Sequence, residues 1–192
     1  MPKSEPRDPD ELFAAALAGD RDGFAALVRL HQGRVFSIAA RMLMDRSLAE
    51  DLAQEVFLQL HRSLHGIDSH RHLVFWLRQV TVRRAIDRLR QEHQTVALDE
   101  NCQLLVADGG CSDPLNSGDP LLARHLRELI GELAPVARAV LLLRYQEDLD
   151  PVDIARALGI PVNTVKSHLK RSLNSLRARL AGLTAVDRGG AV

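Results

Sequence analysis

The stretch DPVDIARALGIPVNTVKSHLKRSLNSLRARL, residues 150–180, has the pattern of two helices joined by a tight turn. Asp150 is placed to cap a helix N-terminus, and Pro151 suits the first helical position. Asp153 adds a carboxylate to the first turn, where the helix dipole favours negative charge. Gly159 ends this short helix, because the turn requires a residue that adopts positive φ readily. The pattern predicts a second helix directly after the turn.

The second helix of this stretch is predicted to have two different faces. Apolar residues recur at steps of three and four and form a single stripe: Val162, Val165, Leu169, Leu173, Leu176 and Leu180. The other face combines amides and hydroxyls, which suit base edges, with cations, which suit phosphates: Asn163, Thr164, Lys166, Ser167, Lys170 and Arg171. We therefore predict a helix-turn-helix whose second helix enters the major groove of DNA. An ordinary helical hairpin with a solvated polar face is the alternative.

The rest of the chain predicts an all-α protein with two small helical domains. Aromatic residues make up only 4% of the 192 residues, so the core depends on aliphatic side chains, which favours helices over a sandwich or barrel. Helical periodicity runs through residues 10–95 and 120–182. Residues 96–119 are rich in Gly, Asp, Ser, Asn and Pro and predict a flexible acidic linker. Residues 1–9 and 183–192 are expected to be disordered.

The formal net charge of zero conceals an uneven distribution. Residues 20–95 carry 12 Lys and Arg against 9 Asp and Glu, and residues 120–182 carry 10 against 6. The linker carries five carboxylates and no Lys or Arg. Two mildly basic domains therefore flank an acidic connection, and each domain is able to face phosphates.

Several classes of protein and site do not fit the sequence. No apolar run approaches the roughly 18 residues of a membrane span, and the N-terminus lacks the apolar segment of a signal peptide. We expect a cytoplasmic protein in which Cys102 and Cys111 are reduced thiols. His61 and His65 have the spacing of a metal pair, but no third ligand accompanies them. No metal or cofactor is therefore expected.

The segment SLAEDLAQEVFLQLHRSL, residues 47–64, predicts an amphipathic helix with a capping box formed by Ser47 and Glu50. Its inward stripe is Leu48, Leu52, Val56 and Leu60, with Phe57 and Leu64 at the edges. The residues left on or near the outside are Asp51, Gln54, Glu55 and Leu58. This acidic face is either plain solvated surface or a docking face for a basic partner.

A polar segment at residues 61–71, interrupted by Gly66, predicts an exposed loop that His70, Arg71 and His72 make weakly cationic. A strongly basic helix is predicted to follow, from about Leu73 to His93. Its arginines can span phosphates, and an adjacent aromatic ring can stack on an unpaired base. The alternative places Trp76 in the core and leaves the arginines solvated. The candidate nucleic-acid contacts of the loop and helix are His65, Ser69, Arg71, Trp76, Arg78, Arg83, Arg84 and Arg88.

Three segments in series resemble the extracytoplasmic-function (ECF) sigma factors, the small promoter-recognition subunits of bacterial RNA polymerase. They are the AED..QEVF segment, the W-L…AID-R-L-R segment and LLLRY…IA..LGIP..TVKSHL, which together span nearly all of residues 20–182. The resemblance implies that Asp51, Gln54, Glu55 and Leu58 dock on the clamp helices of the largest polymerase subunit. It implies that the first domain binds and opens the −10 element, holding a flipped base at its loop, and that the second domain recognises the −35 element.

The same resemblance implies a role for the linker and an additional partner. It implies that residues 96–119 pass through the active-site channel of the polymerase, for which an acidic chain is suited, whereas a solvated tether is the alternative. It also implies an anti-sigma factor as a partner, which would hold the protein at the membrane. Two positions depart from the family pattern: Arg83 stands where an Asn is usual, and Ala134-Pro135 replaces the usual Pro-Pro. We expect Arg83 to change the −10 preference and to add a phosphate contact.

Two other functions are weighed against this one. The segment DIARALGIPVNTVKSHL also resembles the output domains of response regulators, but residues 10–95 lack the alternating strand and helix pattern of a receiver. A helical enzyme would require a clustered nucleophile, base or metal set, and no such cluster is visible. We therefore expect a promoter-directing subunit and not an enzyme.

Overall fold

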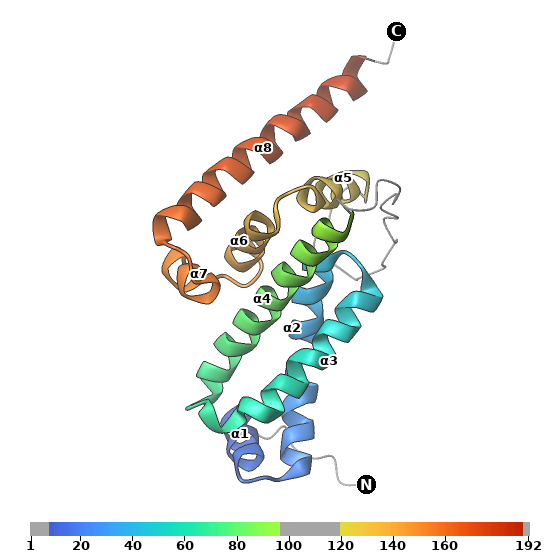
Figure 1. The fold of residues 1–192 in the computed structure, drawn as a ribbon. Coiled ribbons are helices and arrows are strands. Elements are labelled where there is room, and N and C mark those ends of the chain that lie inside the picture. The colour runs from blue at the N-terminus through green and yellow to red at the C-terminus, as the bar shows by residue number, and fades with distance from the viewer. Residues whose placement is uncertain (1–7, 97–119, 190–192) are drawn as a thin grey trace. The chain divides into compact units, whose positions relative to one another are not determined.

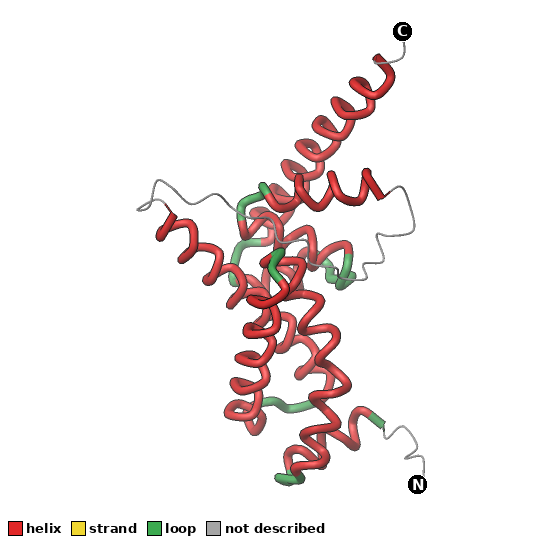
Figure 2. Tube along the Cα trace, turned by 90° about the vertical axis from the view of Figure 1, so that its right-hand side faces the viewer, coloured by secondary structure: helices red, strands yellow, loops and turns green. Residues whose placement is uncertain are grey.

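A computed structural model of the chain describes residues 8–96 and 120–189, with side chains described at 8–91 and 121–181. All regular elements in these ranges are helices (Figures 1 and 2), which confirms the all-α prediction. The chain divides into two compact units, residues 1–107 and 108–192. The predicted linker, including Cys102 and Cys111, lies almost wholly outside the described residues. Among the described helices, none combines the length and apolarity needed to cross a bilayer.

Unit 1 is a helical bundle centred on its second helix. Its elements are α1 (Pro9–Leu17), α2 (Arg21–Leu43), α3 (Arg46–Ser63), the 3₁₀ turn η1 (Leu64–Gly66) and α4 (His70–Val96). Helix α2 packs against α1, α3 and α4, and α3 also packs against α4 (Figure 1). Aliphatic side chains from all of them form the core, among them Leu27, Val35, Val56, Leu60, Leu73 and Leu77.

Helix α3 begins one residue earlier than predicted, and its cap is a different residue. The Asp45 Oδ1 accepts a hydrogen bond from the Leu48 N–H at 2.9 Å, so Asp45 is the N-cap. The predicted capping box is therefore wrong, because Asp45 caps the helix and Ser47 lies inside its first turn, not at the N-cap position. Glu50 instead accepts from the Arg46 Nε at 3.0 Å, one turn away on the exposed surface.

Helix α4 also begins earlier, at His70 and not at Leu73. The Ser69 Oγ accepts from the His72 N–H at 3.1 Å, and the Ser69 carbonyl accepts from the Leu73 N–H at 2.9 Å. Residues 70–72 therefore form the first helical turn and are not part of a loop, which corrects the prediction. Likewise α1 begins at Pro9, one residue earlier than predicted, and Asp8 is its N-cap.

Gly23, in the first turns of α2, allows α1 to approach closely. A Cβ placed on Gly23 would lie 2.7 Å from the Ala15 Cβ and 3.2 Å from the backbone of α1. Real Cβ atoms do not come this close, so any side chain at this position must push α1 away from α2. Gly33, in the middle of the same helix, has nothing within 4 Å of the corresponding position.

We expect Gly23→Ala to lower the free energy of unfolding of unit 1 by about 1–3 kcal/mol, the usual cost of overpacking a tight contact. The matched variant Gly33→Ala should raise it by about 0.5–1 kcal/mol, because alanine is the better helix former where space is open. Trp76 is the only tryptophan and belongs to unit 1, so its fluorescence in a urea titration follows this unit. Equal effects of the two substitutions would contradict the packing described here.

Unit 2 consists of α5 (Pro120–Gly131), α6 (Pro135–Tyr145), α7 (Pro151–Leu158) and α8 (Val162–Gly189). Helix α8 packs against each of the other three, with Leu129, Leu141 and Leu176 buried between them. Arg138 of α6 is also buried and donates to the carbonyl of Gly131, which joins the end of α5 to α6. Helix α8 continues to Gly189, so the predicted end of ordered structure near Gly182 is wrong.

Candidate nucleic-acid interface

The turn between α7 and α8 forms as the sequence predicts. The Asp150 Oδ1 accepts from the N–H groups of Val152 and Asp153, both at 2.8 Å, and Pro151 is the first helical residue. Gly159 has φ 69° and donates its N–H to the Ala155 carbonyl at 2.9 Å. The helix-turn-helix prediction is confirmed, since both ends of the short helix are fixed by these local contacts.

The two predicted faces of α8 are also observed. Val165 and Leu176 are buried, and Leu169, Leu173 and Leu180 are half-buried against the apolar core of unit 2. On the other side Asn163, Lys166, Lys170 and Arg171 are exposed, whereas Thr164 and Ser167 are half-buried. No Asp or Glu occurs between positions 162 and 181. This face therefore presents hydrogen-bonding groups at the start of α8 and uncompensated positive charge one and two turns later, an arrangement that fits a phosphate backbone beside base edges.

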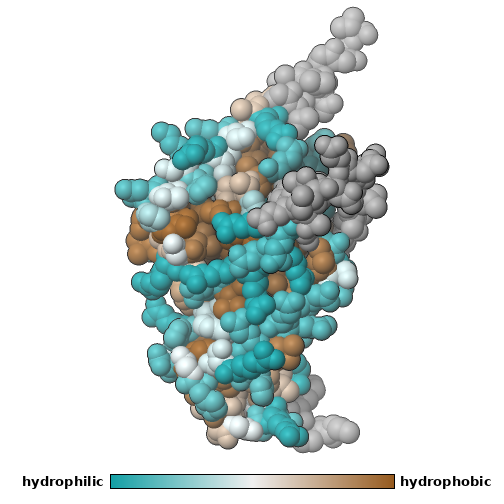
Figure 3. Space-filling view, in the orientation of Figure 1, coloured by the Kyte–Doolittle hydropathy of each residue, from teal (hydrophilic) through white to brown (hydrophobic). Residues whose placement is uncertain are grey.

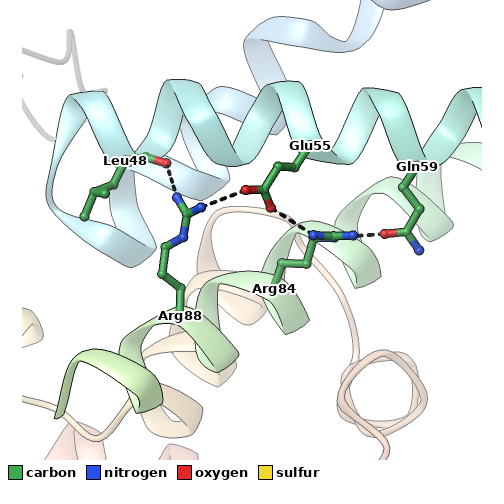
Figure 4. Close-up of polar contacts among 5 residues, drawn as sticks. All are labelled: Leu48, Glu55, Gln59, Arg84 and Arg88. Atoms are coloured by element: carbon green, nitrogen blue, oxygen red, sulfur yellow. Dashed lines mark hydrogen bonds and ion pairs between the residues drawn. The ribbon is translucent and has the colours of Figure 1, made fainter. Parts of the chain in front are cut away.

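In unit 1, two of the predicted nucleic-acid arginines are bound to α3 (Figure 4). Glu55 lies between them: its Oε2 accepts from the Arg84 Nη1 at 2.9 Å and its Oε1 from the Arg88 Nη2 at 2.8 Å. Arg84 also donates through Nε to the Gln59 Oε1 at 2.8 Å, and Arg88 donates through Nη1 to the Leu48 carbonyl at 3.1 Å. We call these five residues the α3–α4 network.

The α3–α4 network changes the predicted positions of several side chains. Glu55 was expected on the outside of α3 but is half-buried and turned toward α4, because the carboxylate meets two guanidinium groups there. Of the remaining predicted contacts, Arg71 and Arg83 are exposed, and hydrophilic surface follows α4 (Figure 3). Trp76 and Arg78 are half-buried. Trp76 packs against the core of unit 1, which agrees with the alternative interpretation that placed this ring in the core. The structure thus leaves Arg71 and Arg83 exposed on α4, whereas Arg84 and Arg88 are bound to α3.

The connection between α3 and α4 is shorter and more firmly held than predicted. His65 and Ser69 are exposed, but Leu64 and Ile67 on either side of His65 are each only 4% exposed and belong to the core. Ser69 caps α4 through its side chain. Only His65, Gly66, Asp68 and Ser69 are therefore exposed in the segment 64–69, and two apolar anchors fix their position.

A partly buried histidine pair, which the sequence did not indicate, connects the start of α4 to α2. The spacing of His31 places it on the buried side of α2, and its Nε2 lies 3.0 Å from the Nε2 of His70. Burial, together with charge repulsion from His70 and Arg34, lowers the pKa of His31 to about 4. The His31 ring is therefore neutral near pH 7. A helical spacing pattern does not reveal such a pair, because the two residues are 39 positions apart.

The stability of unit 1 should depend on the protonation of His31. Its pKa is lower in the folded state than the ordinary value of 6.5, so the unfolded chain takes up the proton first as the pH falls. The stabilisation is complete above pH 6.5 and is lost as the pH falls toward 4, by about 3 kcal/mol in total. Urea titrations at a series of pH values, followed by Trp76 fluorescence, measure this slope.

Replacing His31 by Gln should flatten the pH dependence between 6.5 and 4, because the titrating ring is gone. The control His65→Gln removes an exposed histidine and should leave the slope as in the original chain. An unchanged slope in His31→Gln would show that other groups cause the acid sensitivity.

The outer side of α3 carries the other predicted surface. Asp51, Gln54 and Leu58 are exposed, and Leu58 is 60% exposed although it is a large apolar side chain. Gln54 and Leu58 also line an open apolar groove between α2 and α3, to which Phe24, Val28 and Phe57 contribute. We refer to Asp51, Gln54, Leu58 and this groove as the α3 outer surface. Exposed apolar side chains next to polar ones are typical of a protein-binding surface.

The family comparisons match both units. The family model described as Sigma-70 region 2 matches residues 27–95, and the one described as Sigma-70, region 4 matches residues 123–176. The first covers most of the α2–α4 bundle and the second covers the helix-turn-helix. A region 2 followed by a region 4 defines a sigma factor of the sigma-70 type.

Two relatives that match over most of their length show which kind of sigma factor this chain is. The chain is 30% identical over 175 residues to the ECF RNA polymerase sigma factor SigW of Bacillus subtilis, which covers 86% of this chain and 92% of SigW. It is also 30% identical over 172 residues to the ECF RNA polymerase sigma factor SigK of Mycolicibacterium vanbaalenii, covering 88% and 87%. The chain belongs to the ECF RNA polymerase sigma factors, which direct core polymerase to promoters.

Solved structures have the same fold. CnrH, solved in complex with the cytosolic domain of CnrY, matches with a TM-score of 0.64 at 21% identity, over 91% of this chain and 99% of CnrH. The sigma factor RpoE from Bartonella quintana, solved in complex with the anti-sigma factor NepR, matches with a TM-score of 0.66 at 18% identity, over 82% and 96%. The response-regulator alternative is not favoured, because residues 8–96 contain no strand and a receiver requires a sheet.

Proposed function

We propose that this sigma factor uses three separate surfaces: α8 for the −35 element, the exposed side of α4 with residues 65–69 for the −10 element, and the α3 outer surface for core polymerase. The observation that carries the proposal is the division of α3 and α4 into outward and inward sides. The chain makes and breaks no bonds in this scheme. It positions the polymerase on the promoter and stabilises the opened strand.

On α8 the exposed polar residues divide by chemistry. Asn163 and Thr164 lie at the N-terminal end, where a helix inserted in the major groove meets base edges, and their side chains can donate and accept. Lys166, Lys170 and Arg171 are cations without a nearby acidic residue in sequence, and Ser167 adds a hydroxyl. We assign the amide and hydroxyl at the helix start to sequence discrimination and the cations to phosphates.

Lys170→Ala should weaken promoter binding nearly equally for all −35 sequences and reduce the slope of log affinity against log salt by roughly one. Asn163→Ala should instead change the preferred sequence, at a cost of about 1–3 kcal/mol at one base pair. Fluorescence anisotropy of the holoenzyme on a set of −35 variants, at several salt concentrations, distinguishes the two effects. A uniform loss for Asn163→Ala across the set would place Asn163 among the phosphate contacts.

The −10 element requires a surface that binds an unpaired strand. Arg71 and Arg83 are exposed on α4, and His65 and Ser69 are exposed just before it. A strand held here meets cations on the helix and polar groups on the short connection, as single-strand binding requires. We assign Arg83 to a phosphate, since it places a cation where the family usually has an amide. Trp76 contributes to the core that supports this surface.

The α3 outer surface has the chemistry of a docking site for core polymerase. Its acidic and amide groups, Asp51 and Gln54, lie beside the exposed Leu58 and the apolar groove. A partner with basic and apolar side chains fits this combination. By resemblance to the family, we identify that partner as the clamp helices of the largest polymerase subunit.

Asp51→Arg and Leu58→Asp should each abolish co-purification with core polymerase, with little change in the urea midpoint of unit 1, because both side chains are exposed. Glu11→Arg is the control, since it reverses an exposed carboxylate on α1, outside the α3 outer surface. It should retain polymerase binding. Normal binding by both α3 variants, or a large loss of stability, would overturn the assignment of this surface.

We also infer an anti-sigma factor as a partner of this chain. CnrH and RpoE, which share its fold, were each solved with a bound partner: the cytosolic domain of CnrY for CnrH and the anti-sigma factor NepR for RpoE. An anti-sigma factor that covers the α3 outer surface would compete with core polymerase.

A further inference from the structure

We propose that Glu55, Arg84 and Arg88 are positioning residues that transmit polymerase docking on α3 to the DNA-binding helix α4. The inference rests on the proposed function, because it takes α3 as the docking helix and α4 as the −10 helix. It assigns Glu55 a role inside unit 1 and not on the docking surface, and it removes Arg84 and Arg88 from the set of phosphate contacts.

The geometry of the α3–α4 network fixes one helix on the other. Each guanidinium has two acceptors on α3, and both carboxylate oxygens of Glu55 are used. The acceptors extend from Leu48 to Gln59, about 16 Å along α3 at 1.5 Å per residue. A slide of α4 by one turn, about 5.4 Å, would break all four contacts together. The network therefore sets both the register and the rotation of α4 against α3.

The network lies next to the α3 outer surface. Asp51 and Leu58 are four residues before and three residues after Glu55, so they occupy neighbouring positions on the same helix. On α4, Arg84 follows the exposed Arg83 directly. A displacement of α3 thus reaches Arg84 and Arg88 through Glu55 and its neighbours Leu48 and Gln59. Arg84, which is held, is adjacent in sequence to the exposed Arg83.

The same contacts argue against phosphate binding by these arginines. The side chains are only partly exposed, 39% for Arg84 and 25% for Arg88, and their N–H donors are directed at Glu55, Gln59 and the Leu48 carbonyl. A carboxylate within 3 Å of both guanidinium groups repels an approaching phosphate. Phosphate binding would require Glu55 to release both arginines first.

The test is Glu55→Gln, which keeps the shape of the side chain and removes its charge. The matched control is Asp87→Asn, which removes an exposed carboxylate of α4 that lies outside the network. For each variant we would measure affinity for core polymerase, the urea midpoint of unit 1, and promoter opening by permanganate footprinting. Opening is compared on duplex DNA and on a template that is already melted at the −10 element.

We expect Glu55→Gln to bind core polymerase within about twofold of the original chain, but to lower opening of duplex DNA by about tenfold, within the range of typical coupling between sites. Opening should be restored on the pre-melted template, and Asp87→Asn should behave like the original chain. Arg84→Ala should reproduce the defect of Glu55→Gln, and combining the two should add little, because both act through one network.

Other outcomes overturn the proposal. If Arg84 and Arg88 contact phosphates, Glu55→Gln should raise DNA affinity, because it removes the competing carboxylate. If Glu55 is itself a docking residue, core affinity should fall and excess polymerase should restore opening. If the network only stabilises the fold, the urea midpoint, core affinity and opening should fall together. A failure of the α3 docking surface is seen separately, as normal polymerase binding by Asp51→Arg.

Discussion

The contact between the Glu55 carboxylate and the guanidinium groups of Arg84 and Arg88 is the constraint on which the arrangement of unit 1 depends. The apolar core brings α3 and α4 together, but aliphatic side chains are non-directional and allow one helix to shift on another. Charge-assisted hydrogen bonds with two partners at each arginine impose a single register. The individual ion pairs contribute little to stability because they are partly exposed. Their effect is on geometry.

This constraint allows two helices to serve three purposes. One side of α3 supports the core, one side holds α4, and the remaining side carries Asp51, Gln54 and Leu58 toward solvent. On α4, the exposed Arg71 and Arg83 remain on the outside, and the His31–His70 contact fixes its first turn to α2. In the proposed function, core polymerase and the unpaired strand therefore bind on opposite sides of the α3–α4 network. In unit 2, an aspartate cap and a glycine turn fix the two ends of α7 directly before α8.

Sequence patterns predicted the structure well where the determining contacts are local. The short helix at Asp150–Gly159 is fixed by contacts within a few residues, so its caps, turn and following amphipathic helix could all be predicted. The start of α3 was misplaced because Asp45 and Ser47 are both good caps, and only geometry distinguishes them. The segment at 61–71 was predicted to be an exposed loop because most of its residues are polar. Its two apolar residues, Leu64 and Ile67, are buried in the core and hold the segment in place.

The long-range polar contacts could not be predicted. Glu55 and Arg84 are 29 positions apart, and both are charged residues of the kind usually found on a solvated surface. Their pairing depends on the rotation of α4, which the burial pattern specifies only approximately. His31 resembled a core residue because its spacing is that of the apolar stripe, and nothing in the sequence indicated His70 as its partner. Resemblance to a family suggested functions for the segments, but it did not indicate which arginines of α4 are bound to α3.

Chemical modification of arginine in the unaltered chain tests that division most directly. Phenylglyoxal reacts with accessible guanidinium groups, and peptide mass spectrometry gives the rate at each position for the free protein, the holoenzyme and the promoter complex. We predict that Arg83 reacts fast in the free protein and is protected by the promoter. Arg84 and Arg88 should react slowly in all three states. The account is contradicted if Arg84 and Arg88 react as fast as Arg83 in the free protein and are protected only when the promoter is bound.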